Sequence, residues 1–425
     1  MLEIERREVS LLRASRGWIL VYGRRKVGKT FVIKRYLDWD VYVTVSRARD
    51  AIVEDFTGVR RAELDAALER VSRVLSSGGA AVVDEFQRLP EGAWDLLAAL
   101  HPQGRLIASG SSLGIVGRVF DRRSPLLGLI QPFMMDVIRY ADAVASLSRH
   151  VEARASLEWG ILLRDPWISP MVDPRSEGDP VRWLCDSAPQ LVMSAQGLVG
   201  EVFTEEERNL TALYESVMRL LAEGVWRPSE IAGILSSRGL LEGGTPAVTG
   251  ILARLSSMGL VEGIPLWRSG RARVYYRHRS PLLSLLLYLE QKFGVSDGYA
   301  PEYGPVRSAF GREAEYSVGE MLAERLRGRM AHHVSERRDV DVVVLDARER
   351  RVLAAYEVKL GGFTRSEARE AVERMRGLGP PRVGLVSLRD EPPAVEGADE
   401  LLGPEELVEV ARQLHESASE SGTRG

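Results

Sequence analysis

The sequence predicts an α/β protein in which a parallel sheet, covered by helices on both faces, forms the first domain. Apolar runs alternate with helical segments over residues 1–134. Each run is continuous rather than interrupted by polar residues, which is typical of strands buried on both faces. One run leads directly into a glycine-rich motif. The expected strands are Trp18–Tyr22, Val41–Val45, Ala80–Val83 and Leu106–Ser109, and the expected helices include Val59–Leu75 and Glu91–Leu100.

The glycine-rich motif lies between the first strand and a helix and fits the pattern of a phosphate-binding loop, or P-loop. Its backbone N–H groups and the positive end of the helix suit a polyphosphate. Lys29, as a catalytic residue, would reach the β- and γ-phosphates of ATP, and Thr30 would bind Mg²⁺. A glycine turn without a ligand is the alternative. The residues expected to bind the nucleotide are Gly23, Arg24, Arg25, Lys26, Val27, Gly28, Lys29, Thr30 and Phe31.

Two carboxylates follow the strand at Ala80–Val83. Asp84 is expected to bind the same Mg²⁺ through water, and Glu85, as a second catalytic residue, to polarise an attacking water. This glutamate favours hydrolysis over transfer to a small acceptor, with an ordinary acidic strand end as the alternative. At the end of the next strand, Ser109 or Ser111 is expected to contact the γ-phosphate or the water, with a simple serine-rich turn as the alternative.

Residues 135–205 are expected to form a helical lid or connector, with helical spacing over Asp136–Leu163 and a proline-rich stretch after it. Residues 206–290 show the order helix, helix, helix, hairpin, which is typical of a winged helix-turn-helix. Its helices are expected at Leu210–Ala222, at Pro228–Leu235 and from the N-cap Thr245 onward. The arginine-rich hairpin suits the phosphate backbone of DNA, and the alternative is a wing used for protein contact. The expected DNA contacts are Arg268, Arg271, Arg273 and Arg277.

Residues 291–414 carry a group of carboxylates around an expected β-hairpin. The strands Val340–Leu345 and Val352–Lys359 would bring Asp341 beside Glu357, and a preceding helix would add a third carboxylate. Two or three carboxylates can bind Mg²⁺ or Mn²⁺, which lowers the pKa of a bound water. A surface hairpin with a salt bridge is the alternative. The expected metal ligands are Glu315, Asp341 and Glu357, and the expected catalytic residues are Glu357 and Lys359.

Lysine is scarce in this chain: only five of the 57 basic residues are lysine. Lysine is a compact point charge, whereas the arginine fork grips carboxylates and phosphates. Two of the five, Lys29 and Lys359, fall at positions expected to be catalytic. This coincidence favours a working site at Lys359 over a surface salt bridge.

Composition limits the class of protein further. A net charge of −3 provides no global positive field, so any binding of nucleic acid must use local patches. The single cysteine, Cys185, excludes an intramolecular disulfide and a cysteine-rich zinc site. No apolar run reaches about 18 residues, so we expect a cytoplasmic protein without a membrane partner. The polar tail 415–425 is expected to be disordered.

These motifs together resemble the archaeal ATPase family, a group of AAA+/STAND-related P-loop ATPases. The resemblance implies an AAA+-like P-loop NTPase sheet, a helical lid, a winged helix-turn-helix and a C-terminal α/β domain like the PD-(D/E)xK restriction endonucleases. On that pattern Glu315, Asp341, Glu357 and Lys359 correspond to metal-binding and catalytic positions. The residues that carry the resemblance are Gly23–Thr30, Val83–Gln87, Ser109–Ser112, Ser124–Leu126, Pro228–Ala232, Phe310–Arg312 and Val340–Asp341.

The sequence therefore predicts a Mg²⁺-dependent ATPase in which the nucleotide state moves the lid and the winged helix, in a context that involves DNA. One alternative is an ATP-gated, metal-dependent DNA nuclease that acts through the C-terminal domain. Another is a nucleotide-responsive DNA-binding regulator without significant turnover. A homo-oligomer is also an open alternative, with an arginine finger acting in cis or across a subunit interface. The arginines considered for that role are Arg118, Arg122 and Arg123.

Overall fold

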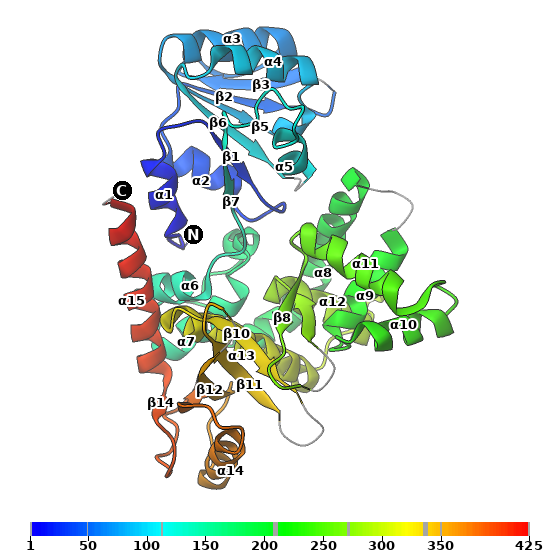
Figure 1. Cartoon of the computed structure of the whole chain (residues 1–425), viewed down its shortest axis with the longest axis vertical. Helices are drawn as coiled ribbons and strands as arrows, with labels where there is room; N and C mark the ends of the chain where they lie inside the picture. The colour runs from blue at the N-terminus through cyan, green and yellow to red at the C-terminus, as the bar shows by residue number, and fades with distance from the viewer. Residues whose placement is uncertain are drawn as a thin grey trace.

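The structure is a computed structural model that describes residues 2–48, 50–111, 114–206, 211–269, 273–334, 339–348 and 351–423. An α/β unit lies at one end of the molecule, and a larger body of helices with a second sheet lies at the other (Figure 1). Among the described residues, no helix has the length and apolar character needed to cross a membrane.

The α/β unit is built on a seven-stranded sheet with the strand order β4-β3-β2-β5-β6-β1-β7. The strands from β2 to β7 in this order are parallel. Apolar clusters cover both faces, one formed with α1 and α2 and the other with α3 and α4, as the continuous apolar runs predicted. The elements are β1 (Ile19–Tyr22), β2 (Val41–Val45), β5 (Ala80–Asp84), β6 (Arg105–Gly110), β7 (Gln131–Met134), α1 (Glu8–Ala14), α2 (Lys29–Tyr36), α3 (Leu64–Ser76) and α4 (Glu91–Leu100).

The predicted helix Val59–Leu75 is wrong in its first part. Two further strands, β3 (Asp50–Asp55) and β4 (Gly58–Glu63), form an antiparallel hairpin, and α3 begins only at Leu64. Gly58 lies next to the hairpin turn with a φ of +116°, a conformation that favours glycine. Because β4 is an exposed edge strand, it lacks the apolar pattern from which a strand is predicted.

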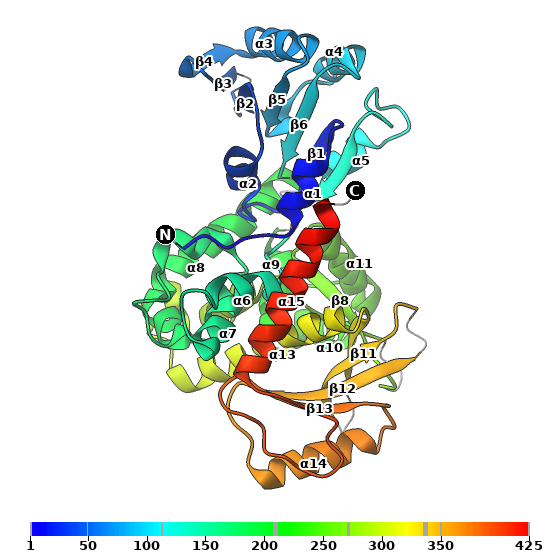
Figure 2. The same cartoon turned by 90° about the vertical axis from the view of Figure 1, so that its left-hand side faces the viewer.

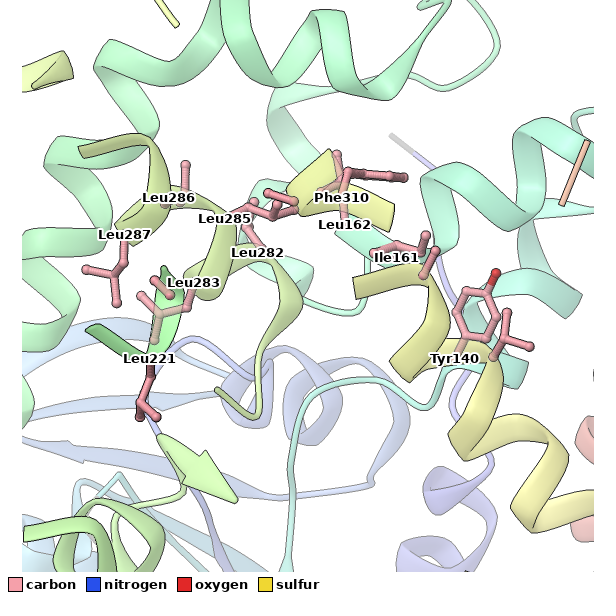
Figure 3. Packing of buried hydrophobic residues seen from close by; sticks show 14 of the residues in the cluster. Tyr140, Ile161, Leu162, Leu221, Leu282, Leu283, Leu285, Leu286, Leu287 and Phe310 are labelled. Atoms are coloured by element: carbon pink, nitrogen blue, oxygen red, sulfur yellow. The ribbon is translucent and has the colours of Figure 1, made fainter. Parts of the chain in front are cut away.

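The helical part of the body packs around one large apolar core. Figure 3 shows Leu282 and Leu285 of α12 beside Leu162 of α7 and Phe310 of α13, and all four are buried. Because α12 is apolar on all sides, it lies at the centre of this core rather than on its surface. The helices are α6 (Tyr140–Leu147), α7 (Ala153–Leu162), α8 (Pro180–Glu206), α12 (Pro281–Phe293) and α13 (Tyr303–Arg325).

The connector differs from its prediction in two respects. The helix predicted over Asp136–Leu163 is two helices, because α6 ends at Leu147 and α7 begins at Ala153. The proline-rich stretch contains a short 3-10 helix, Pro166–Met171, and then leads into α8, which was not predicted. Proline at the start of α8 is compatible with a helix, but a run of prolines in the sequence had indicated a connector.

Three helices followed by a hairpin occur in the predicted order over residues 211–278. They are α9 (Thr211–Ala222), α10 (Pro228–Ser237), α11 (Gly244–Ser257), β8 (Val261–Pro265) and β9 (Val274–His278). The predicted N-cap Thr245 is wrong, because the N-cap of α11 is Gly243 with a φ of +109°. The two adjacent glycines allow the chain to enter the helix two residues earlier than the threonine suggested.

The second sheet has five strands in the order β10-β11-β12-β13-β14. The antiparallel hairpin of β11 and β12 has the predicted boundaries and register. Helix α13 covers one face, and α14 (Arg365–Arg376) covers the other. The edge strands β10 and β14 were not predicted. The bounds of the strands are β10 (Arg329–His333), β11 (Val340–Leu345), β12 (Val352–Lys359), β13 (Val383–Ser387) and β14 (Glu400–Leu402).

The end of the chain is helical, so the prediction that the tail from residue 415 is disordered is wrong for the residues described. Helix α15 (Pro404–Thr423) runs back along the body to α6 and α1 (Figure 2). His415 is buried where α15 meets α6, and its Nδ1–H donates a hydrogen bond to the Asp142 carboxylate over 2.9 Å. This contact fixes the C-terminal helix to the segment that follows the α/β unit.

Candidate nucleotide site and carboxylate cluster

The phosphate-binding loop connects β1 to α2, as predicted. Gly28 is the N-cap of α2 and has a φ of +93°, which favours glycine. Gly23 lies so close to the following segment that a Cβ atom there would stand 1.9 Å from the carbonyl oxygen of Met135. Both glycines are therefore required by the backbone, and the first N–H groups of α2 are directed toward the loop.

Lys29 is the first residue of α2, and its side chain folds back over the loop. Its Nζ donates to the carbonyl oxygens of Gly23 (2.8 Å) and Arg24 (2.9 Å). Burial lowers the pKa of Lys29 to about 8, although Asp84 and Glu85 raise it. The ammonium group is thus held by neutral acceptors at the centre of the loop, where a polyphosphate would be a stronger partner.

Asp84 ends β5 directly opposite the start of α2. Its Oδ2 accepts from the hydroxyl groups of Thr30 (3.1 Å) and Tyr42 (2.7 Å). Its Oδ1 accepts from the backbone N–H of Glu85 over 2.9 Å. The Thr30 hydroxyl and the Asp84 carboxylate are hard oxygen donors, so this pair suits Mg²⁺, which usually keeps several waters and takes one or two protein ligands.

Glu85 follows with a φ of +57°, a strained conformation for a residue with a side chain. Its carboxylate accepts from Gln87 Nε2 (2.8 Å) and forms ion pairs with Arg88 (3.0 Å) and Arg25 (3.8 Å). Gln87 also donates to the Ser111 hydroxyl over 3.0 Å. The strand ends of β5 and β6 are thereby connected through one amide side chain.

Lys29, Thr30, Asp84, Glu85 and Ser111 line a cavity of about 520 Å³. Part of the lining is polar and contains Lys29, Thr30, Asp84 and Glu85; a second part, called the apolar wall, consists of apolar and aromatic side chains. Sequence reasoning did not find that second wall, because nothing in the local pattern of the connector indicates that it faces the P-loop. The residues of the apolar wall include Leu2, Ile4, Ile138, Pro166, Trp167 and Pro170.

Not every predicted nucleotide-binding residue reaches the cavity. Arg25, Lys26, Val27, Gly28 and Phe31 line it with the residues named above, whereas Gly23 and Arg24 do not.

Ser109 is fully buried within β6, in register with Asp84 of β5 and Val21 of β1. Ser111 lines the cavity instead, so the geometry favours Ser111 over Ser109 as the polar group of this strand end.

The arginines expected to contact DNA differ in accessibility. Arg268 and Arg273 are exposed, and Arg271 lies outside the described residues. Arg277 is buried, forms an ion pair with Glu313 and lies over the ring of Tyr316, with its guanidinium carbon 3.3 Å from the ring centroid. The prediction that Arg277 contacts DNA is therefore wrong, because its charge is compensated inside the body.

The hairpin of β8 and β9 is also packed against the second sheet. The backbone N–H of Trp267 donates to the carbonyl oxygen of His332 in β10 over 2.8 Å, and the Trp267 ring packs against the core beneath α14. Arg268 donates to the carbonyl oxygen of Leu378 over 3.0 Å. Trp267 and Arg268 of the predicted wing thus contact protein, which was the alternative interpretation of this hairpin.

The carboxylates of the second sheet come together as predicted, although they are not arranged as a metal site. Asp341 Oδ2 accepts from the backbone N–H of Val358 over 2.9 Å. Burial and then Glu357 raise the pKa of Asp341 to about 7, while burial and then Asp341 raise the pKa of Glu315. Among the described residues, no three acidic, histidine or cysteine side chains stand close enough together to hold a metal ion. The prediction of a three-carboxylate metal set is not met by this arrangement.

The carboxylate cluster is the group of Glu315, Asp341 and Glu357. Glu357 and the nearby Lys359 of β12 are both held by ion pairs with α14. Glu357 pairs with Arg374 over 2.5 Å. Lys359 pairs with Glu367 over 2.7 Å, and its Nζ lies 4.9 Å from the centroid of the Phe363 ring. Lys359 therefore lies in the salt bridge that was the alternative interpretation of its motif.

Comparisons with known proteins give only distant likenesses. No family model matches the chain, and no curated protein sequence matches it. The solved structure of the Aeropyrum pernix ORC1 protein in complex with DNA is 15% identical over 69% of this chain and 95% of its own, with a TM-score of 0.31. The Aeropyrum pernix ORC2 protein is 13% identical over 67% of this chain and 92% of its own, with a TM-score of 0.39.

A STAND protein with a tetratricopeptide repeat sensor from Pyrococcus horikoshii is 14% identical over 77% of this chain and 50% of its own, with a TM-score of 0.29. At these identities and TM-scores, the likenesses assign neither the fold nor the function of this chain.

Proposed function

We propose that the chain is a Mg²⁺-dependent ATPase whose active site is the cavity between the P-loop and the strand ends of β5 and β6. One observation carries this proposal: Lys29, Thr30, Asp84 and Glu85 line a single cavity. These four residue types correspond to the phosphate lysine, the Mg²⁺ hydroxyl, the Mg²⁺-side carboxylate and the water-orienting carboxylate of P-loop hydrolases.

Each residue has a defined part in the proposed reaction. Lys29 would exchange the carbonyl oxygens of Gly23 and Arg24 for the β- and γ-phosphates. Thr30 and Asp84 would hold Mg²⁺, which neutralises developing phosphate charge when bound. Glu85 would accept a hydrogen bond from the attacking water and orient it. The apolar wall with Trp167 would bury the nucleoside part of the ligand.

Phosphate release from ATP tests this proposal. Lys29→Ala is expected to lower the rate by about 100-fold or more, because one preorganised donor to the transferring phosphoryl group is lost. Lys34→Ala is the matched control, since Lys34 lies on the same helix but pairs with Glu54 outside the cavity. Equal loss in both variants would indicate damage to α2 rather than to a phosphate site.

We also propose that the ATPase is coupled to DNA through the unit of α9, α10, α11 and the β8–β9 hairpin. The exposed Arg268 and Arg273 support this proposal, and the packing of Trp267 against the second sheet opposes it. Replacing both arginines with alanine should weaken DNA binding. It should also lower the slope of log affinity against log salt concentration by about one to two, because fewer counterions are released on binding. Arg175→Ala is the control, because Arg175 is exposed in the connector and pairs with Asp173. DNA affinity that changes with ATP in the absence of turnover would support a regulator instead.

A metal-dependent nuclease is the second candidate function. The specific observation in its favour is that burial and the neighbouring carboxylates raise the pKa values of Asp341 and Glu315, which indicates a concentrated negative field. The test is cleavage of single- and double-stranded DNA with Mg²⁺ or Mn²⁺, with and without ATP, in the wild type and in Lys359→Ala. If the wild type never cleaves DNA, this candidate is rejected.

A further inference from the structure

Arg24 points away from the nucleotide cavity although it belongs to the P-loop. Its guanidinium group pairs with Asp165 of the connector, and the two residues are 7% and 0% exposed. A buried arginine and a buried aspartate require each other, because either one alone would leave an uncompensated charge in the interior. The side chain of a P-loop residue is therefore fixed to the body rather than to the ligand.

Asp165 has a second partner in the body. Its Oδ2 accepts from the hydroxyl of Ser280 over 2.5 Å. Ser280 is the N-cap of α12, and its Oγ accepts from the backbone N–H of Leu283 over 2.9 Å. Three polar side chains thus connect the P-loop to the first turn of α12: Arg24, Asp165 and Ser280, called the Arg24–Asp165–Ser280 bridge below.

The backbone of Arg24 is bonded to the group that would respond to a nucleotide. Lys29 Nζ donates to the carbonyl oxygen of Arg24 over 2.9 Å. If Lys29 turns toward phosphate oxygens, this bond is released and the loop segment that carries Arg24 loses one of its constraints. Asp165 is buried and bonded on both sides, so a shift of Arg24 is transmitted to Ser280 rather than absorbed by solvent.

We propose that the Arg24–Asp165–Ser280 bridge is the positioning element that couples nucleotide occupancy of the P-loop to the N-terminus of α12. The proposal rests on the proposed nucleotide site. Helix α12 directly follows β9, the second strand of the hairpin considered for DNA contact, and its leucines lie at the centre of the body's core (Figure 3). A shift in the position of the first turn of α12 would therefore move both the end of the hairpin and the side chains that α12 contributes to the core.

Hydrogen exchange of the full-length protein tests this proposal. The amides of the P-loop and of the first turn of α12 are followed with and without a non-hydrolysable ATP analogue and Mg²⁺. In the wild type, the analogue should slow exchange at the P-loop and change exchange at residues 281–286 by about fivefold or more, the lower end of typical coupling between sites. In Ser280→Ala and Asp165→Asn, the P-loop response should remain while the α12 response is lost.

The measured quantity is the nucleotide-dependent difference, because Ser280→Ala also removes a helix cap and alters exchange without any ligand. Ser280→Thr, which keeps a capping hydroxyl, should restore the response. Glu313→Gln is the matched control: it alters another buried arginine pair, that of Arg277, which includes no P-loop residue, and should leave the response intact.

The outcomes separate this inference from the proposed function. If the analogue changes neither the P-loop nor α12 in the wild type, the nucleotide site itself is wrong. If it protects the P-loop but leaves residues 281–286 unchanged, the coupling is overturned while the site stands. A full α12 response in both Ser280→Ala and Asp165→Asn also overturns it, because the signal then passes by another route.

Discussion

The nucleotide cavity and the carboxylate cluster contain the same kinds of residue, but their side chains have different partners. At the cavity, Lys29 and Asp84 are bonded to carbonyl, hydroxyl and amide groups. At the cluster, Glu357 and Lys359 are bonded to opposite charges on α14. A neutral partner can be exchanged for a charged ligand, whereas an ion pair must be broken and its other member left without compensation. Residue type therefore identifies both regions as candidates, and the difference lies in the partners of particular residues: Lys29 and Asp84 have neutral partners, whereas Glu357 and Lys359 are in ion pairs. Glu85 is the exception at the cavity, because it pairs with Arg88 and Arg25.

The largest effect on ATP hydrolysis is expected at Glu85. Glu85→Gln should lower phosphate release by about 100- to 10,000-fold, because a carboxylate that orients the attacking water is lost. Nucleotide affinity, measured by titration with a fluorescent ATP analogue, should stay close to that of the wild type. Glu54→Gln is the control, since Glu54 pairs with Lys34 outside the cavity. Unchanged turnover in Glu85→Gln would remove this residue from the mechanism.

A smaller effect is expected where a neutral partner supports the Mg²⁺-side carboxylate. Tyr42 donates to Asp84 Oδ2 over 2.7 Å, and Tyr42→Phe removes only this hydroxyl. Because such supporting bonds orient a metal ligand, the Mg²⁺ concentration needed for half-maximal ATPase activity should rise by about 10- to 100-fold. Tyr22→Phe on strand β1 of the same sheet is the control. A Mg²⁺ requirement equal to that of the wild type would show that Asp84 does not depend on Tyr42.

The parallel sheet and the P-loop could be predicted from the sequence because each depends on local pattern. Continuous apolar runs indicated β2 and β5, and the spacing of Gly23, Gly28 and Lys29 indicated the loop. The hairpin β3–β4 could not be predicted, because β4 is an exposed edge strand whose residues bear no apolar signature. Helix α8 was missed for the opposite reason: its prolines carry a local signal that tertiary packing overrides.

The partners of the site residues could not be predicted, because they come from distant parts of the chain. Arg24 meets Asp165 across 141 positions of sequence, and Lys359 meets Glu367 only because α14 folds onto β12. The burial of Arg277 likewise depends on Glu313 of α13. A single sequence gives the residue types of a site, whereas burial and pairing depend on packing between elements.

Arg374 allows a test of whether an ion pair keeps metal ions from the carboxylate cluster. If the ion pair over 2.5 Å closes the carboxylate cluster, Arg374→Ala should free Glu357 and strengthen Mn²⁺ binding by about tenfold, equivalent to one modest electrostatic contact. Isothermal titration calorimetry with Mn²⁺ alone measures this change without any assay of activity. Arg376→Ala is the matched control, because Arg376 lies on the same helix and pairs with Asp399. If Mn²⁺ binding is equally weak in both variants, the cluster is a structural feature and the salt bridge is not what closes it.

The smallest expected effect concerns α15, which packs against α6 of the body and α1 of the α/β unit. His415 faces Asp142 of α6, Glu5 and Arg7, and its hydrogen bond with Asp142 raises its pKa above the ordinary value. A raised pKa means that the folded state binds the proton more tightly, so the stabilisation is fully present below about pH 6.5 and is lost as pH rises through the folded-state pKa.

His415→Gln should therefore lower the free energy of unfolding by about 1 kcal/mol at pH 6, the order expected for one partly buried ion pair, and by less at pH 9. Urea unfolding at the two pH values measures this difference. Arg412→Ala is the control, since Arg412 lies on the same helix and donates a hydrogen bond to the hydroxyl of Ser148. An equal loss of stability at both pH values would mean that His415 stabilises α15 through packing alone, and the two regions would then be joined independently of its charge.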